Sequence, residues 1–248
     1  MDPQATRRGL ALAREATEAH DRRVPRPDLR PLPVTRSPIR RLPQLFFGLA
    51  LYGTSMAMQV HAGLGLNPWD VLHQGLTTKF PLSFGAITAI TGAIVLLIWI
   101  PLRQRPGVGT VANVVVIAFA VDIALALLPQ PTGPAWRITM MVGGIVLNGI
   151  ASALYIGARL GPGPRDGLMT GVSARTGWSI RLVRTGIEVV VLGTGWLLGG
   201  TVGIGTVLYA LAIGPLTQAF LPFFTYRAPV ERVVPGAPDA NPGTTLAA

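Results

Sequence analysis

Long stretches without a charged residue constrain this sequence more than any other feature. Residues 80–102, 138–158 and 189–226 contain no Asp, Glu, Lys or Arg. A helix needs about 20 mainly apolar residues to cross the hydrocarbon core of a membrane. A soluble helical protein would instead carry a polar stripe along every helix, and these stretches lack one. The sequence therefore predicts an all-α integral membrane protein.

Prolines and glycines between the apolar segments divide the chain into expected membrane spans. Six spans are expected, at about residues 43–61, 83–101, 108–128, 138–158, 181–198 and 204–223. The membrane domain then covers residues 43–225. We expect residues 1–42 to form a disordered basic tail and residues 226–248 a second disordered tail, because neither has a strong apolar pattern. A surface helix over residues 6–20 is the alternative for part of the first tail.

Positive charge is distributed unevenly around the spans. The formal net charge is +10. If the N-terminus is inside the cell, the outer loops hold only Lys79 and Arg137, and the other basic residues outside the spans are cytoplasmic. This asymmetry predicts a multi-pass protein of the bacterial plasma membrane with both termini in the cytoplasm. Charge that flanks apolar spans favours the lipid bilayer as partner, and we expect no nucleic-acid binding.

The sequence gives no sign of an enzyme or of a bound cofactor. It has no cysteine, which excludes disulfides and Cys-ligated metals. His61 and His73 have no partner at metal-binding spacing. The Gly-rich stretches near residues 107 and 203 lack the third glycine of a dinucleotide site and the Lys-Ser/Thr of a phosphate loop. We therefore expect no metal, no cofactor and no catalytic residues.

The two halves of the chain repeat one pattern at a constant distance of 96 residues. The residues that recur include Pro68, Asp70, Gly75, Ser83, Gly109 and Thr110, matched by Pro164, Asp166, Gly171, Ser179, Gly205 and Thr206. Repeat one covers about residues 43–128 and repeat two about 138–223. Three spans per copy predict two inverted three-helix repeats, each with a short connecting or re-entrant helix, as in many transporters. Duplication that persists only because it packs well is the alternative.

Each repeat carries a Pro-x-Asp motif after its first span. Asn67 is the expected N-cap of a short helix, and Asp70 and Asp166 fall in first turns, at the positive end of the helix dipole. Arg165 replaces Trp69, which suggests a cytoplasmic position for the arginine and an outer one for the aromatic. Capping is one interpretation of both acids. The other is that both helix starts point inward and hold an anionic solute or a coupling ion.

Three further ionisable residues, His73, Asp122 and Glu188, join Asn67, Asp70 and Asp166 as candidate site residues. Ionisable groups inside a membrane are costly and are often functional. Glu188 follows Arg184 by four residues, so a salt bridge on one helix face is its structural alternative. Asp122 has no cation nearby in the sequence. A hydrogen-bonded structural role is the alternative for His73.

The run Leu64-Gly65-Leu66-Asn67-Pro68-Trp69-Asp70-Val71-Leu72-His73, followed later by Gly-x-Gly-Thr, resembles the YczE/YitT-like bacterial membrane proteins. The resemblance covers about residues 43–225. It implies a multi-pass plasma-membrane protein with no established substrate or reaction. The C-terminal soluble domain of YitT-type relatives has no counterpart after Tyr226, which favours the shorter YczE-like branch.

Two functions fit these observations. The first is a small-solute transporter or exporter with alternating access across the inverted repeats, driven by an ion gradient. The second is a membrane accessory or regulatory protein that docks partners on its basic cytoplasmic face without transport. The solute or ion, the direction of movement and homo-oligomerisation stay open.

Overall fold

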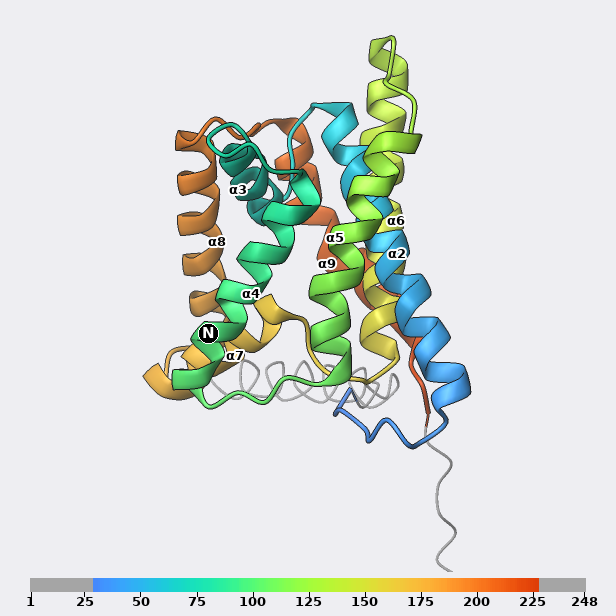
Figure 1. The fold of residues 1–248 in the computed structure, drawn as a ribbon, viewed down its shortest axis with the longest axis vertical. Coiled ribbons are helices and arrows are strands. Elements are labelled where there is room, and N and C mark those ends of the chain that lie inside the picture. The colour runs from blue at the N-terminus through green and yellow to red at the C-terminus, as the bar shows by residue number, and fades with distance from the viewer. Residues whose placement is uncertain (1–28, 228–248) are drawn as a thin grey trace, which may run out of the picture.

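The structure is a computed structural model that describes residues 29–227. The surface helix that is the alternative to disorder at residues 6–20 lies outside this range. Within it, the chain forms α-helices and no strand, which confirms the all-α class (Figure 1). The eight helices in this range are α2 (Pro38–Ala62), α3 (Pro68–Thr77), α4 (Phe84–Leu102), α5 (Val108–Leu127), α6 (Pro134–Gly157), α7 (Pro164–Thr176), α8 (Ile180–Leu197) and α9 (Ile204–Phe224).

Four of these helices are long and apolar enough to cross a membrane, namely α4, α5, α6 and α9. The other two long helices are more polar. α2 carries Gln44 and Gln59, and α8 carries Glu188 with two arginines. Length and composition therefore give four candidate spans, and the crossing of the membrane by α2 and α8 stays a prediction.

α2 and α6 pack against each other, and each also contacts one further long helix, α5 on α2 and α9 on α6. Glycines permit the close approach of α2 and α6. A Cβ atom at Gly48 of α2 would lie 3.0 Å from the backbone nitrogen of Tyr155, and one at Gly144 of α6 would lie 3.1 Å from the Ser55 carbonyl oxygen. Small residues at such crossings are typical of membrane helices, where close van der Waals packing drives association.

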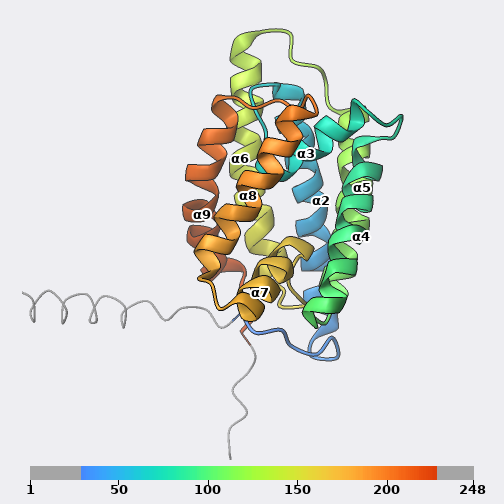
Figure 2. The ribbon, with the colours of Figure 1, turned by 90° about the vertical axis from the view of Figure 1, so that its left-hand side faces the viewer.

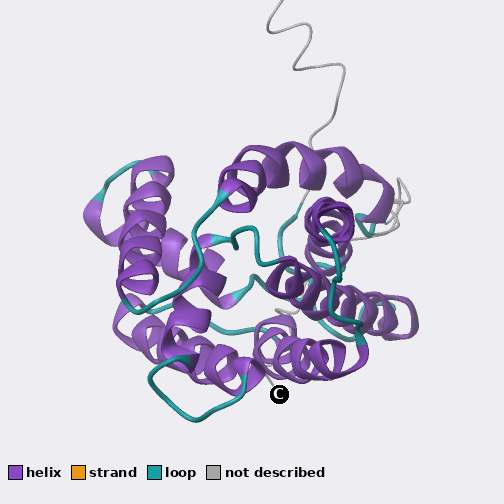
Figure 3. Ribbon diagram, turned by 90° about the horizontal axis from the view of Figure 1, so that it is seen from above, coloured by secondary structure: helices purple, strands orange, loops and turns teal. Residues whose placement is uncertain are grey.

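The two short helices lie near opposite ends of the bundle, α3 at the top and α7 at the bottom in Figures 1 and 2. α3 packs against α8, and α7 packs against α4. Each short helix is therefore held by a long helix from the other half of the sequence. The view from above in Figure 3 shows the helices joined by loops at the ends of the bundle.

The N-terminal boundary differs from the sequence prediction. The tail predicted over residues 1–42 overlaps α2, which begins at Pro38. Arg41 is fully buried, and the backbone nitrogen of Leu32 donates a 2.9 Å hydrogen bond to the Arg159 carbonyl oxygen. Residues 29–42 are folded because they pack against the loop between α6 and α7, which the sequence pattern does not reveal. Residues 1–28 and 228–248 lie outside the described range.

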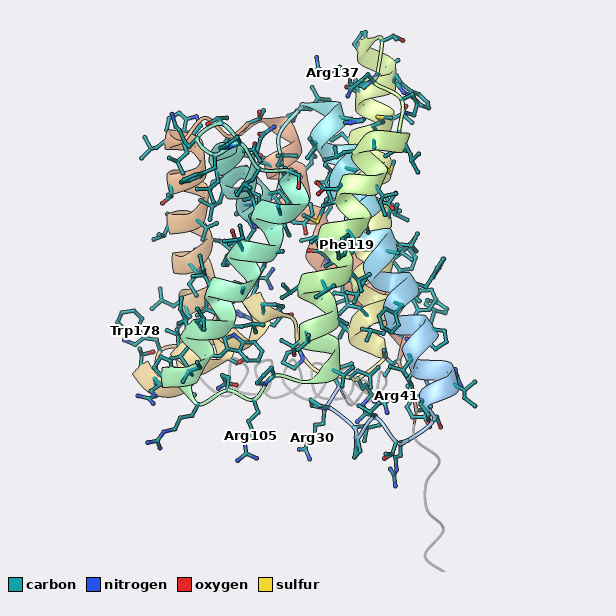
Figure 4. All side chains as sticks on the ribbon, in the orientation of Figure 1. Arg30, Arg41, Arg105, Phe119, Arg137 and Trp178 are labelled. Atoms are coloured by element: carbon teal, nitrogen blue, oxygen red, sulfur yellow. The ribbon has the colours of Figure 1, made fainter. Side chains whose placement is uncertain are left out.

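The two ends of the bundle differ in charge. Figure 4 places Arg30, Arg41 and Arg105 at one end, called the basic end below, and Arg137 at the opposite end. The start of α2 and the end of α9 meet at the basic end, where the Ser37 and Tyr226 hydroxyl oxygens are 2.8 Å apart. This arrangement agrees with the predicted segregation of arginine, and which end faces the cytoplasm stays a prediction.

Candidate functional site

A cavity of about 300 Å³ lies between the short helices and the long ones. Its lining includes Asn67 and Trp69 at the start of α3 and Gly163 and Asp166 at the start of α7, together with residues of α2, α4, α5, α6, α8 and α9. The two Pro-x-Asp motifs therefore border one space, although their helices lie near opposite ends of the bundle. Both first turns must point toward the interior.

The start of α3 is closed by its own side chains. The Asn67 Oδ1 atom accepts a 3.1 Å hydrogen bond from the Asp70 backbone nitrogen, which confirms Asn67 as the N-cap. The Asn67 Nδ2 atom donates a 2.5 Å hydrogen bond to Asp70 Oδ2. Both side chains are buried. Asn67 lines the cavity, whereas Asp70 lies behind it, where its carboxylate holds the Asn67 side chain that caps the helix.

The start of α7 has no side-chain cap, since its N-cap residue is Gly163. The Asp166 carboxylate faces the hydroxyl of Tyr155, which donates a hydrogen bond of 3.3 Å to Oδ2. Both residues line the cavity. Asp166 therefore lines the cavity, whereas Asp70 does not.

Arg165 and Trp69 lie against each other. The Arg165 guanidinium carbon is 4.9 Å from the centre of the Trp69 ring, and Arg165 Nη2 is 3.7 Å from Asp70 Oδ1. The prediction that the two residues occupy opposite membrane interfaces is wrong. Because both first turns point inward, the residues that follow the two prolines meet at the cavity.

Arg184 and Glu188 bring a second pair of opposite charges to the cavity. Arg184 Nε donates a 3.0 Å hydrogen bond to Glu188 Oε1, which confirms the salt bridge predicted from their spacing. The side chains are 59% and 34% exposed.

His73 lies beside Asp70 and also lines the cavity. Its Nδ1 atom is 3.4 Å from Asp70 Oδ1 and 3.2 Å from the Thr88 hydroxyl oxygen. Burial lowers the pKa of His73 and raises the pKa of Asp166, because loss of water disfavours the charged form of each group. Both residues lie on short helices, outside the long segments.

Asp122 lies apart from the other candidates and does not line this cavity. Its Oδ2 atom accepts a 2.6 Å hydrogen bond from the Ser83 hydroxyl, and its Oδ1 atom accepts a 2.7 Å hydrogen bond from the Gly85 backbone nitrogen. Asp122 on α5 thus binds the start of α4.

Sequence reasoning missed the neutral polar residues around the cavity. Tyr209 of α9 donates a 3.0 Å hydrogen bond to Asn148 Oδ1, and Asn148 Nδ2 donates a 2.8 Å hydrogen bond to the Ser55 hydroxyl. Tyr52 and Tyr155 make an edge contact with ring centres 6.1 Å apart. Asn148 is the one amide residue in the uncharged stretch 138–158. Because polar groups inside a membrane segment need partners, its presence could have predicted a hydrogen-bond partner on another helix.

The family of unknown function DUF6198 has a model that matches residues 39–222, which is most of the chain. The chain belongs to this family. An uncharacterized protein of Haemophilus influenzae is 42% identical to this DUF6198 protein over 177 residues, covering 71% of this chain and 81% of the relative. The uncharacterized membrane protein YczE of Bacillus subtilis is 34% identical over 180 residues, covering 71% and 83%.

These matches confirm the resemblance to YczE-like proteins. Together with the four apolar helices of sufficient length, they establish a membrane protein of the DUF6198 family. A third relative, the uncharacterized protein YyaS of Bacillus subtilis, is 24% identical over 179 residues, covering 71% of this chain and 89% of the relative. No solved structure gives a significant match.

Proposed function

We propose that this DUF6198 protein transports a small polar solute across the bacterial plasma membrane. In this proposal α2 and α8 also span the membrane, the six spans form two inverted repeats, and the basic end faces the cytoplasm. The observation that supports it most is that the first turns of α3 and α7, one from each half of the chain, border the same cavity. Broken or short helices that meet at a central site are typical of transporters built from inverted repeats.

Reciprocal contacts between the halves support the inverted repeat. The Gly109 backbone nitrogen at the start of α5 donates a 2.9 Å hydrogen bond to the Leu160 carbonyl oxygen. The Gly205 backbone nitrogen at the start of α9 donates a 2.8 Å hydrogen bond to the Leu64 carbonyl oxygen. These pairs match at the 96-residue distance. A twofold axis that exchanges the halves would produce each contact between them twice. The hydrogen bond from a glycine nitrogen to a leucine carbonyl occurs twice in this way.

The charges at the cavity favour a solute that carries both an acidic and a basic group. Arg165 and Arg184 offer positive charge, and Asp166 and Glu188 offer negative charge. At the start of α7 the Asp166 carboxylate lies beside the Gly163 backbone, at the positive end of the helix dipole. A cavity of about 300 Å³ lies at the lower end of small-molecule sites. We therefore infer a solute of the size and charge of an amino acid.

Uptake into liposomes tests this proposal. The purified full-length protein is reconstituted, and a mixture of ¹⁴C-labelled zwitterionic amino acids is supplied outside under an imposed proton gradient of either direction. We expect accumulation above protein-free liposomes. Asp166→Asn and Glu188→Gln remove one cavity charge each and should lower the initial rate at least about tenfold, a loss typical of one charged binding contact. The control is Lys79→Gln, at an exposed site outside the cavity, which should keep the rate.

Two results would contradict the proposal. One is no uptake by the unchanged protein under either gradient. The other is uptake at the same rate in both cavity variants. The first result favours the alternative in which the protein docks partners at its basic end without transport.

A further inference from the structure

Two helix pairs occupy equivalent positions in the halves of the chain, yet they pack differently. α4 packs against α5, and a Cβ atom at Gly92 of α4 would lie 3.1 Å from the Val114 side chain. In the described part of the chain, α8 and α9 do not pack along each other. In the view of Figure 1, α8 lies at the left edge and α9 lies apart from it.

The same difference appears at single positions 96 residues apart. Ala118 on α5 is buried, and its carbonyl oxygen faces Gly85 of α4. The equivalent residue on α9 is Gly214, where an added Cβ atom would meet nothing within 4 Å. Gly214 lines the cavity, whereas Ala118 does not. The backbone at Gly214 on α9 is therefore free of contact with another helix, whereas the equivalent position on α5, Ala118, packs against α4.

Asp122 holds the α4–α5 pair together. The Ser83 hydroxyl caps α4 by accepting a 3.1 Å hydrogen bond from the Ala86 backbone nitrogen. It also donates to Asp122 at 2.6 Å, and the Gly85 backbone nitrogen donates to the other carboxylate oxygen at 2.7 Å. The start of α4 is thereby tied to α5. This tie lies at the end of the bundle opposite the basic end (Figure 1).

The α8–α9 pair has an equivalent serine cap, but no hydrogen bond from α9 reaches it among the described residues. Ser179 caps α8 by accepting a 3.3 Å hydrogen bond from the Leu182 backbone nitrogen. The residue that matches Asp122 is Gln218, which is exposed on α9 and lines the cavity. Among residues 29–227, no hydrogen bond joins Ser179 to Gln218. Trp178, just before this cap, lies at the basic end in Figure 4.

We propose that the α4–α5 and α8–α9 pairs are two gates of the cavity, with the first closed by Asp122 and the second open toward the basic end. This inference rests on the proposed transport function, because alternating access needs one gate at each end. When the second gate closes, Gln218 reaches the capped start of α8 as Asp122 reaches α4. A carboxylate binds such donors more strongly than a neutral amide does. The stronger tie therefore keeps the first gate closed at rest.

Single cysteines test the gates, since the chain has no cysteine of its own. Ala118→Cys and Gly214→Cys report the equivalent positions of the two gates. The reporters are introduced one at a time into the full-length protein in liposomes and treated with a membrane-permeant maleimide. We expect fast labelling at 214 and slow labelling at 118 in the otherwise unchanged protein.

Asp122→Ala removes the tie at the first gate. Labelling at 118 should rise and labelling at 214 should fall, each at least about tenfold (about 1.4 kcal/mol). Gln218→Asp places a carboxylate at the second gate and should change both rates in the same directions. The two reporters respond oppositely because the gates share one conformational equilibrium.

A purely structural role for Asp122 predicts a different pattern. Asp122→Ala would then expose position 118 and leave labelling at 214 unchanged, and this result would overturn the proposal. Unchanged labelling at 118 in Gln218→Asp would overturn it as well, and that variant decides the question if Asp122→Ala does not fold. Labelling needs no solute, so opposite changes without amino-acid uptake reject only the transport proposal. Uptake without opposite changes rejects only the gates.

Discussion

The guanidinium of Arg41 lies inside the protein at the basic end, and its replacement tests how that end is held together. It makes five hydrogen bonds, all to carbonyl oxygens, on Leu32, Pro33, Arg36, Ala158 and Arg159. These carbonyls belong to the segment before α2 and to the residues that follow α6. Arg41 therefore links the N-terminal segment to the loop that leads into α7.

The expected cost follows from the burial of these acceptors. The bonds to Ala158 and Arg159 are buried, and the other three are partly open to water. The buried Ala158 carbonyl loses its donor, which costs about 1–3 kcal/mol. The Arg159 carbonyl keeps the hydrogen bond from the Leu32 backbone nitrogen, so it loses only one bond to a charged group, worth about 1.5–3 kcal/mol. At the three carbonyls that are partly open, water replaces the donor. Relief of the buried charge offsets part of this cost. We expect Arg41→Met to lower the free energy of unfolding by about 3 kcal/mol.

Thermal unfolding of the detergent-solubilised protein, followed by size-exclusion chromatography after heating, measures the effect. A loss of about 3 kcal/mol corresponds to a fall in Tm of roughly 6–12 °C for a chain of this size. Methionine keeps the length of the apolar stem, so the variant isolates the guanidinium. The matched control is Arg40→Met, because Arg40 is the neighbouring residue and is exposed. We expect the control to shift Tm by less than about 2 °C. Equal Tm values for the two variants would refute the reasoning.

Two further predictions concern helix packing. Gly195→Val should prevent folding or lower Tm by several degrees, because a side chain at 195 would overlap the α3 backbone at Leu72. The control Gly193→Val should leave Tm unchanged, since an added Cβ atom there meets nothing within 4 Å. Equal Tm values for the two variants would contradict the contact between α8 and α3. Tyr209→Phe should cost about 1 kcal/mol through the lost hydrogen bond to Asn148. A double-mutant cycle with Asn148→Ala should then show non-additive Tm shifts, and additive shifts would rule out the coupling.

Local sequence patterns predicted the parts of the site that depend on nearby residues. The Arg184–Glu188 salt bridge followed from the spacing of four residues on one helix, and the Asn67 cap followed from the order Asn-Pro-x-Asp. In both cases the helix geometry alone brings the partners together. The apolar runs likewise predicted the positions of the long helices within a few residues, apart from the earlier starts of α2 and α6.

Contacts between the halves were not predictable from those patterns. Arg165 meets Trp69 because α3 and α7 dock with both starts inward, which no local spacing encodes. The same holds for Asp122 at the start of α4, which has no cation nearby in the sequence but finds two hydrogen-bond donors on another helix. The burial of Arg41 also depends on carbonyls far away in the chain.

The sequence by itself determined an all-helical membrane protein with a pattern repeated at 96 residues, because uncharged length and residue order are properties of the chain alone. Only the tertiary structure decided that the two repeated motifs border one cavity, and that α4 packs on α5 while α8 stands apart from α9. Such contacts depend on how preformed helices pack against one another. The repeat pattern marks equivalent positions, but the halves differ at some of them, such as Asp122 and Gln218, and the packing of whole helices decides what each difference does.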